Sequence, residues 1–237
     1  MKAHTRYLPI TFIRTTTTNW SGLIVDGGRG RLTYTTVKYA CSDTQKANVA
    51  VINRGQLDMT DSMLQECHCG GGAGERVLYI DSSTATVQSS IFTTSDEYPI
   101  YVLGTDSHVT MTENILQDNC YNWILLSPDA MMGHDTTRYA QTDWDGYRLE
   151  SYYTVPVGVT LTLEPGVIIR AQGAYTDSDI FNVQGRSIAA GVAVFVAGPN
   201  RVEFWQSQPL RPGTIYTATI TTGVRETSGD ALVATHE

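Results

Sequence analysis

A short cluster of soft metal ligands is the densest chemical motif in this chain. Cys67, His68 and Cys69 follow one another and lead into Gly70, and Cys41 precedes them by about one structural repeat. Thiolate sulfur and imidazole nitrogen suit zinc, so these four ligands predict a divalent-metal site. Zinc sites usually separate paired cysteines by two residues, whereas one separates them here. The alternatives are a disulfide from Cys41 to Cys67 or Cys69, and a turn with Cys67 inside and His68 in solvent.

A second candidate site lies around residues 131–150, MMGHDTTRYAQTDWDGYRLE. His134 and Asp135 have the types needed for an acid/base pair. Asp143 and Asp145 suit a hard cation such as calcium, or two carboxylates beside a sugar. These four residues predict a hydrolase or a polysaccharide lyase or glycosidase, with or without a bound metal. The alternative is an ordinary turn, because the full spacing of a calcium-binding EF-hand loop is absent.

Aromatic side chains offer a third kind of site. Trp20, Trp144, Tyr147 and Tyr152 are candidates for stacking on sugar rings. Aromatic rings serve equally well as core residues, and the sequence leaves both interpretations open.

The elements that must position these residues follow a repeat of about 25 residues. Its clearest copies are RLTYTTVKY, QLDMTDSML, TATVQSSIF and HVTMTENIL, led by Leu32, Leu57, Ala85 and Val109 at intervals of 25, 28 and 24 residues. Apolar residues alternate with a period of two, and Tyr34, Met59, Val87 and Met111 are predicted as the second inward position. An apolar strand precedes each copy. Such units bury their apolar faces only when stacked, which predicts a solenoid of parallel strands.

Small polar residues recur at the predicted corners of each turn. One column is Ser62, Ser90 and Asn114, and a second is Cys67, Ser95 and Asn119. Stacked side chains of this kind satisfy one another's hydrogen bonds, and the segment 164–166 is predicted as a further corner.

The outward positions of the repeat are rich in threonine. They include Thr33, Thr35, Thr60, Thr110 and Thr112. A flat threonine array suits an ice lattice, but Asp58 and Gln88 interrupt it and threonine is a common exposed strand residue.

Longer segments resemble secreted bacterial right-handed parallel β-helix proteins. These segments are PITFIRTTTTNWSGLIVDGG, TVPVGVTLTLEPGVIIRAQG and FNVQGRSIAAG, and the resemblance covers about residues 8 to 195. It implies an all-β fold, a right-handed parallel β-helix of about seven rungs over residues 1–195, and a secreted or cell-surface parent protein.

The C-terminal segment resembles another family. FWQSQPLRPGTIYTATITTGVRETSGDALVA resembles the last strands of a bacterial Ig-like domain, which implies a partial antiparallel Ig-like segment over residues 196–237. We expect it to dock on the helix end or to exchange with another chain. The chain also starts inside what looks like a continuing helix, so a fragment of a longer protein and a homodimer through an uncapped solenoid end are expected.

Composition narrows the choice of partners. The net charge of −8 disfavours nucleic acid, which needs clustered Lys and Arg. No apolar run is long enough for a membrane span, and the N-terminus lacks the apolar stretch of a signal peptide. Catalytic signatures of polysaccharide-degrading β-helix enzymes, such as Gly-His-Gly, are absent. The sequence therefore predicts a non-catalytic scaffold that binds carbohydrate or a cell-surface ligand, with the hydrolase or lyase as the alternative.

Overall fold

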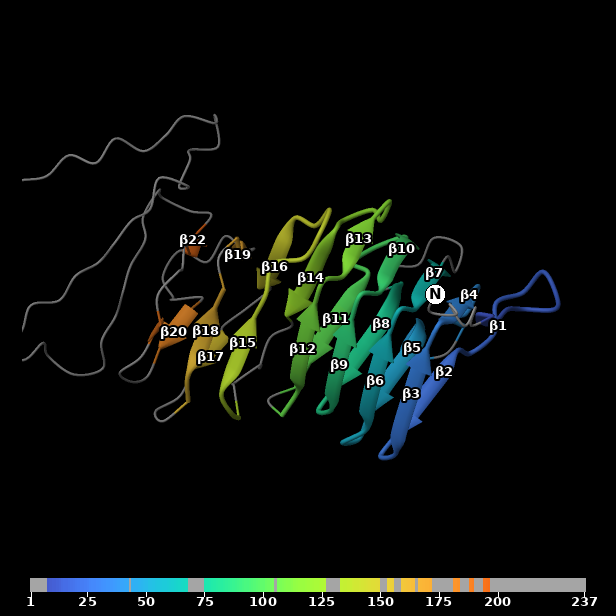
Figure 1. Ribbon diagram of the computed structural model, residues 1–237, viewed down its shortest axis with the longest axis horizontal. Helices are drawn as coiled ribbons and strands as arrows, with labels where there is room; N and C mark the ends of the chain where they lie inside the picture. The colour runs from blue at the N-terminus through green and yellow to red at the C-terminus, as the bar shows by residue number, and fades with distance from the viewer. Residues whose placement is uncertain are drawn as a thin grey trace, which may run out of the picture.

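The computed structural model describes residues 8–42, 44–67, 75–104, 106–126, 133–149, 153–155, 159–164, 166–171, 181–183, 188–189 and 194–196. These residues form a parallel β-solenoid of about five turns, and every regular element among them is a strand. Figure 1 shows successive turns stacked along the long axis of the molecule. The predicted all-β solenoid is confirmed.

Strands of three kinds alternate along the chain. The continuous face is one eight-stranded sheet of β2 (Leu23–Asp26), β5 (Ala47–Ile52), β8 (Arg76–Asp81), β11 (Ile100–Leu103), β14 (Trp123–Leu126), β16 (Gly146–Leu149), β19 (Ile169–Ala171) and β22 (Val194–Val196). The interrupted face consists of two sheets. They are β3 (Arg29–Thr33), β6 (Gln56–Thr60), β9 (Thr84–Gln88) and β12 (His108–Thr112), then β15 (Thr136–Arg138), β18 (Leu161–Leu163) and β21 (Ile188–Ala189).

The short face completes the cross-section. It holds β1 (Ile10–Phe12), β4 (Thr35–Lys38), β7 (Met63–Cys67), β10 (Ile91–Ser95) and β13 (Ile115–Gln117), while β17 (Tyr153–Val155) and β20 (Phe181–Val183) form a separate pair. Past β13, the described residues continue this face with a single bridge from Ile115 to Thr142. The structure has about five turns, slightly fewer than the predicted count of about seven rungs.

The core is a set of inward columns that run along the solenoid. On the interrupted face, Leu57, Ala85 and Val109 form one column, and Met59, Val87 and Met111 form the next. All six side chains are buried, as the alternating pattern predicts.

The first turn follows a different register from the predicted one. Gly30 pairs with Leu57 and Leu32 pairs with Met59, so Leu32 occupies the second inward position and Tyr34 lies 40% exposed at the corner. A Cβ atom on Gly30 would lie 2.7 Å from Cγ2 of Val25, so the Val25 side chain fills the space that a side chain at position 30 would need. Sequence reasoning passed over Gly30 because it has no apolar side chain.

The two predicted polar columns are confirmed as hydrogen-bonded ladders. In the first, the backbone N–H of each residue donates to the side chain of the next: Thr35 to Ser62 Oγ (3.0 Å), Ser62 to Ser90 Oγ (3.2 Å), Ser90 to Asn114 Oδ1 (3.0 Å) and Asn114 to Gln141 Oε1 (3.1 Å). Thr35 is thus buried, and not outward as predicted. In the second column, Ser95 pairs with Cys67, and its N–H donates to Asn119 Oδ1 at 3.1 Å.

Glu164 and Gly166 lie at a corner, as predicted for the segment 164–166. They follow β18 of the interrupted face and precede β19 of the continuous face, and Gly166 has a φ of 85°. A positive φ of this size favours glycine.

The interrupted face changes between β12 and β15. These strands lie side by side but are not paired within one sheet. We call this break the seam.

Several predictions concern residues outside the described ranges. Residues 197–237 of the predicted Ig-like segment lie there, and the predicted domain boundary between residues 195 and 196 falls within β22. The described residues contain no helix able to cross a membrane. The right-handed sense of the solenoid and the bacterial family stay predictions.

Candidate functional site

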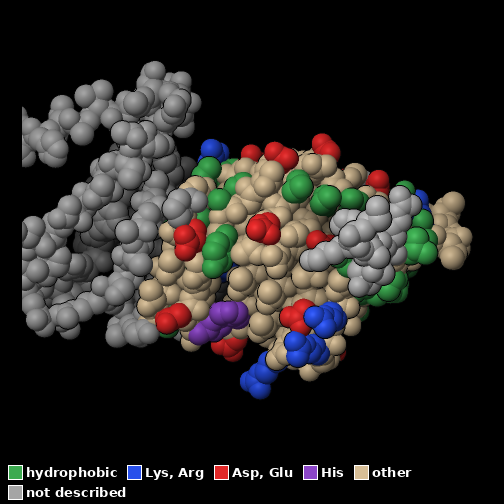
Figure 2. Space-filling model, viewed as in Figure 1, with side chains coloured by type: hydrophobic (Ala, Val, Ile, Leu, Met, Phe, Trp, Pro, Cys, Tyr) green, Lys and Arg blue, Asp and Glu red, His purple; other side chains and the backbone are tan. Residues whose placement is uncertain are grey.

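The structure brings His134 next to His108, a residue that sequence reasoning did not place in any site. Their ring centroids are 4.1 Å apart with the planes tilted by 47°. His108 begins β12, and His134 precedes β15, so the pair spans the seam. Nε2 of His134 is buried and has no hydrogen-bond partner among the described residues. Figure 2 shows the described histidines as one patch on the molecular surface.

The surroundings of His108 favour its neutral imidazole. Burial lowers the pKa of His108, and the neighbouring His134 and the Arg138 guanidinium lower it further. Arg138 lies beneath the surface with Nη1 donating to Val109 O at 3.0 Å.

The three predicted carboxylates lie at turns. Oδ1 of exposed Asp135 accepts from Thr160 N at 2.7 Å, and Oδ2 of exposed Asp145 accepts from Asn122 N at 3.3 Å. Asp143 is exposed with a φ of 55°.

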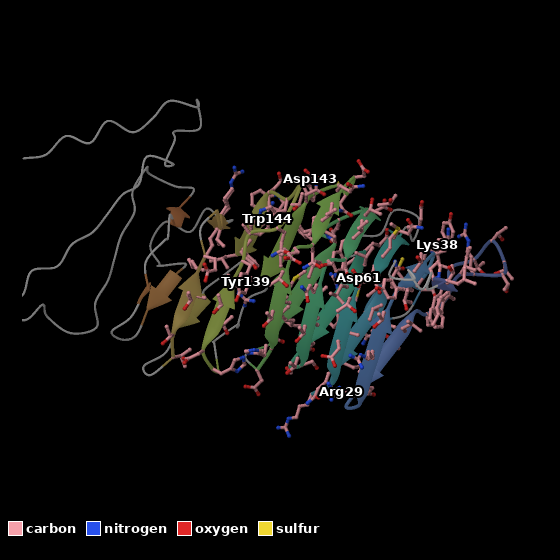
Figure 3. All side chains as sticks on the ribbon, viewed as in Figure 1. Arg29, Lys38, Asp61, Tyr139, Asp143 and Trp144 are labelled. Atoms are coloured by element: carbon pink, nitrogen blue, oxygen red, sulfur yellow. The ribbon has the colours of Figure 1, made fainter. Side chains whose placement is uncertain are left out.

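The predicted catalytic quartet is divided between two corners. His134 and Asp135 precede β15 of the interrupted face, whereas Asp143 and Asp145 precede β16 of the continuous face. Figure 3 shows Asp143 and Trp144 at the upper edge of the molecule, with Tyr139 nearer its middle. Across the described ranges, no three His, Cys, Asp or Glu side chains gather where they could hold a metal ion.

The predicted sugar-stacking residues do not form one surface. Tyr147 is 2% exposed, and its hydroxyl donates to Tyr139 O at 3.2 Å, so its ring belongs to the core. Trp144 packs edge-on against Tyr147 with ring centroids 5.0 Å apart. Trp20 lies in the first turn with Nε1 donating to Lys38 O at 3.0 Å. Tyr152 lies outside the described residues.

The cysteine cluster is described only in part. Cys41 and Cys67 are buried and are not joined to each other by a disulfide. Sγ of Cys67 lies 2.9 Å from Arg76 O, which fits a thiol in the inward ladder. His68 and Cys69 lie outside the described residues, so the metal site stays a prediction.

The continuous face carries a row of outward side chains that sequence reasoning missed. Strand register aligns Tyr79, Tyr101, Leu125, Arg148 and Arg170 across five neighbouring strands. Leu125 is buried at 2% exposure, and the other four side chains are half-buried or exposed. The rings of Tyr79 and Tyr101 stack with centroids 5.7 Å apart and planes within 8°. We call these five residues the outward row.

Cationic and aromatic groups flank the outward row. Arg76 Cζ lies 4.2 Å from the ring centroid of Tyr101, and Arg170 Cζ lies 4.8 Å from that of Trp123. Tyr98 stacks on Tyr121 with centroids 5.3 Å apart. The Tyr121 ring is 45% exposed, so an aromatic group on this side is open to solvent.

Burial raises the pKa of the Tyr79 phenol. The Asp81 carboxylate raises it further, and the Arg76 guanidinium acts in the opposite direction. The phenol therefore stays protonated at neutral pH and can donate a hydrogen bond at the surface.

The repeat contained the signal for this row. Tyr79 in RVLYIDSS and Tyr101 in IYVLGTD occupy matching positions of the strands that precede each copy. Aligning those strands by their outward residues would have found the pair.

Comparison with known proteins does not supply a family. No family model, curated protein or solved structure matches the chain.

Proposed function

We propose that this protein is a non-catalytic scaffold that binds carbohydrate through the continuous face. The outward row carries the proposal, because register repeats its side chains from turn to turn along the solenoid. Neighbouring strands are about 4.8 Å apart, so the row offers an extended chain contacts along the solenoid on either side of the buried Leu125.

The side chains in and beside the row have suitable chemistry. Tyr, Trp and Arg are enriched where proteins bind partners, because each combines a large apolar surface with hydrogen-bonding groups. Half-buried Tyr101 offers apolar contact with the C–H groups of a sugar. The guanidinium groups of Arg148 and Arg170 can bind sugar hydroxyl groups or carboxylates.

The proposed setting is outside the cell or at its surface. A rigid solenoid that presents repeated side chains suits a long polymeric ligand, and such polymers are abundant there. The chain's net charge of −8 leaves nucleic acid a poor alternative polymer.

The hydrolase or lyase alternative has weaker geometric support. Its four predicted residues lie at two corners, and Asp135 and Asp145 accept backbone hydrogen bonds at turns. His134 retains a buried nitrogen, Nε2, without a hydrogen-bond partner in the described residues.

A polysaccharide array that includes neutral and acidic chains tests the proposal. The wild type should bind at least one class, and Tyr101→Ala or Arg170→Ala should weaken that binding about tenfold, which corresponds to about 1.4 kcal/mol. The matched control is Thr110→Ala, an outward change on the interrupted face, which should keep wild-type affinity. Equal affinity in all four proteins, or no binding to any chain, would overturn the proposal.

A further inference from the structure

The seam is a place where side chains replace a backbone ladder. Elsewhere on the interrupted face, neighbouring strands are paired over two to five residues, as β9 is with β12 over five. Between β12 and β15 that pairing is missing, although both strands are parts of the same face.

Two buried side chains bond to carbonyl groups of β12 from across the seam. Arg138 Nη1 donates to Val109 O at 3.0 Å, and Gln141 Nε2 donates to Met111 O at 3.0 Å. Both carbonyl groups would otherwise lack the partner that a paired strand supplies. The seam is thus closed below the surface by polar side chains.

At the surface, the seam is spanned by His108 and His134. Their rings are in contact, and Nε2 of His134 is buried without a hydrogen-bond partner in the described structure. An imidazole nitrogen that makes no hydrogen bond keeps a lone pair for a metal ion.

The ring separation is close to that needed for coordination of one ion by both residues. Metal–nitrogen bonds of about 2.0–2.1 Å at ligand angles of roughly 90–110° place the centroids of two coordinating imidazole rings about 4.5–5.2 Å apart. The observed 4.1 Å is slightly shorter, so the two rings must move apart and turn before both can bind one ion.

We propose that His108 and His134 bind a divalent transition-metal ion that joins the two sheets across the seam. Two imidazole nitrogens supply the protein ligands, and water fills the other positions. Imidazole ligands suit zinc, copper and nickel rather than calcium. This inference is independent of the proposed carbohydrate binding and of the predicted cysteine site.

The charged groups around the pair have opposite effects on the binding of a cation. A metal ion binds the neutral form of imidazole. Arg138 repels a cation, but its guanidinium is fixed below the pair on Val109 O. Exposed Asp135 follows His134 and adds a negative charge to this corner. We therefore expect moderate affinity, as befits two protein ligands.

Nickel binding to the chelator-treated protein is the first test. Isothermal titration should give one Ni²⁺ ion whose dissociation constant rises at least tenfold in His108→Ala and in His134→Ala. The matched control is His68→Ala, which alters the cysteine cluster and should leave this binding unchanged. Unchanged binding in both seam variants, or loss only in His68→Ala, would overturn the proposal.

A second measurement needs no variant and detects where the ion acts. Ni²⁺ should slow amide hydrogen exchange in β12 and β15 of the wild-type protein, because coordination opposes separation of the two sheets. Exchange in β3 and β6, at the other end of the interrupted face, should not change. Slower exchange confined to segments other than β12 and β15 would contradict a seam site, even if nickel binds.

Discussion

The continuous face and the interrupted face join successive turns of the solenoid in different ways. The continuous face keeps backbone pairing through eight strands, so its outward side chains are free to form a surface row. The interrupted face loses pairing at the seam, where Arg138, Gln141 and the two histidines connect neighbouring turns. Where the backbone ladder is complete, side chains are available for binding, and where it is broken they are needed for structure.

The largest expected effect comes from removing Gln141 at the seam. Its Oε1 accepts from Asn114 N and Nδ2, and its Nε2 donates to Met111 O. Gln141→Leu would leave these buried groups without partners and should lower the free energy of unfolding by about 3 kcal/mol. Urea denaturation measures this loss. Gln117→Leu, a half-buried change on the short face, should cost about 0.5 kcal/mol or less, and similar losses for the two variants would remove the special role of the seam.

A pair of arginine variants compares the two faces directly. Arg138 is 5% exposed and binds Val109 O, whereas half-buried Arg148 lies over the Tyr98 ring in a continuous sheet. Arg138→Met should lower the free energy of unfolding by about 2 kcal/mol, and Arg148→Met by about 0.5 kcal/mol. Thermal and urea unfolding of both variants test this order. A larger loss for Arg148→Met would reverse the comparison.

A glycine variant tests the regular part of the interrupted face. Gly30→Ala would place Cβ 2.7 Å from the Val25 side chain and should cost about 1–2 kcal/mol by overpacking. Gly28→Ala is the matched control, because the nearest atom to its new Cβ is 3.8 Å away. The double variant Gly30→Ala/Val25→Ala should cost less than the sum of its single variants. Equal stability of the two alanine variants would contradict the inward position of Gly30.

The smallest expected effect is a dependence of folding stability on pH that arises from His108 at the seam. The pKa of His108 is lower in the folded protein than in the unfolded chain, mainly because of burial. The unfolded chain therefore takes up a proton first as the pH falls below about 6.5, and stability decreases from there toward the folded pKa. Denaturation in chelator-containing buffer on both sides of that pH should show the decrease.

The control for this pH effect is a change on the neighbouring strand. His108→Gln should flatten the dependence, while Thr84→Gln, which alters the strand partner of His108, should keep it. The same slope in His108→Gln as in the wild type would assign the dependence to other groups.

The sequence predicted the repeating part of this fold well. Period-two alternation located the strands, and the recurring Ser62, Ser90 and Asn114 located a real ladder, because each turn repeats the same demand for a buried hydrogen bond. The first turn was misaligned because Gly30 contributes no apolar side chain to the pattern.

The seam and its histidine pair could not be predicted from the repeat pattern. Arg138 and Gln141 replace backbone pairing at one place only. Because this replacement does not recur from turn to turn, no sequence period reveals it. His108 and His134 are separated by about one repeat, so stacking them was open to sequence reasoning only once the register between β12 and β15 was known. Tyr147 was misassigned to a sugar-binding surface because an aromatic residue in a strand does not reveal which side it faces.

Hydrogen exchange with and without the best-binding polysaccharide is the most direct test of the proposed function. Binding at the outward row should slow exchange in β8, β11, β14 and β16 of the continuous face and leave β3, β6 and β9 unchanged. Protection confined to the interrupted face, or no polysaccharide that binds at all, would contradict the assignment of carbohydrate binding to the continuous face.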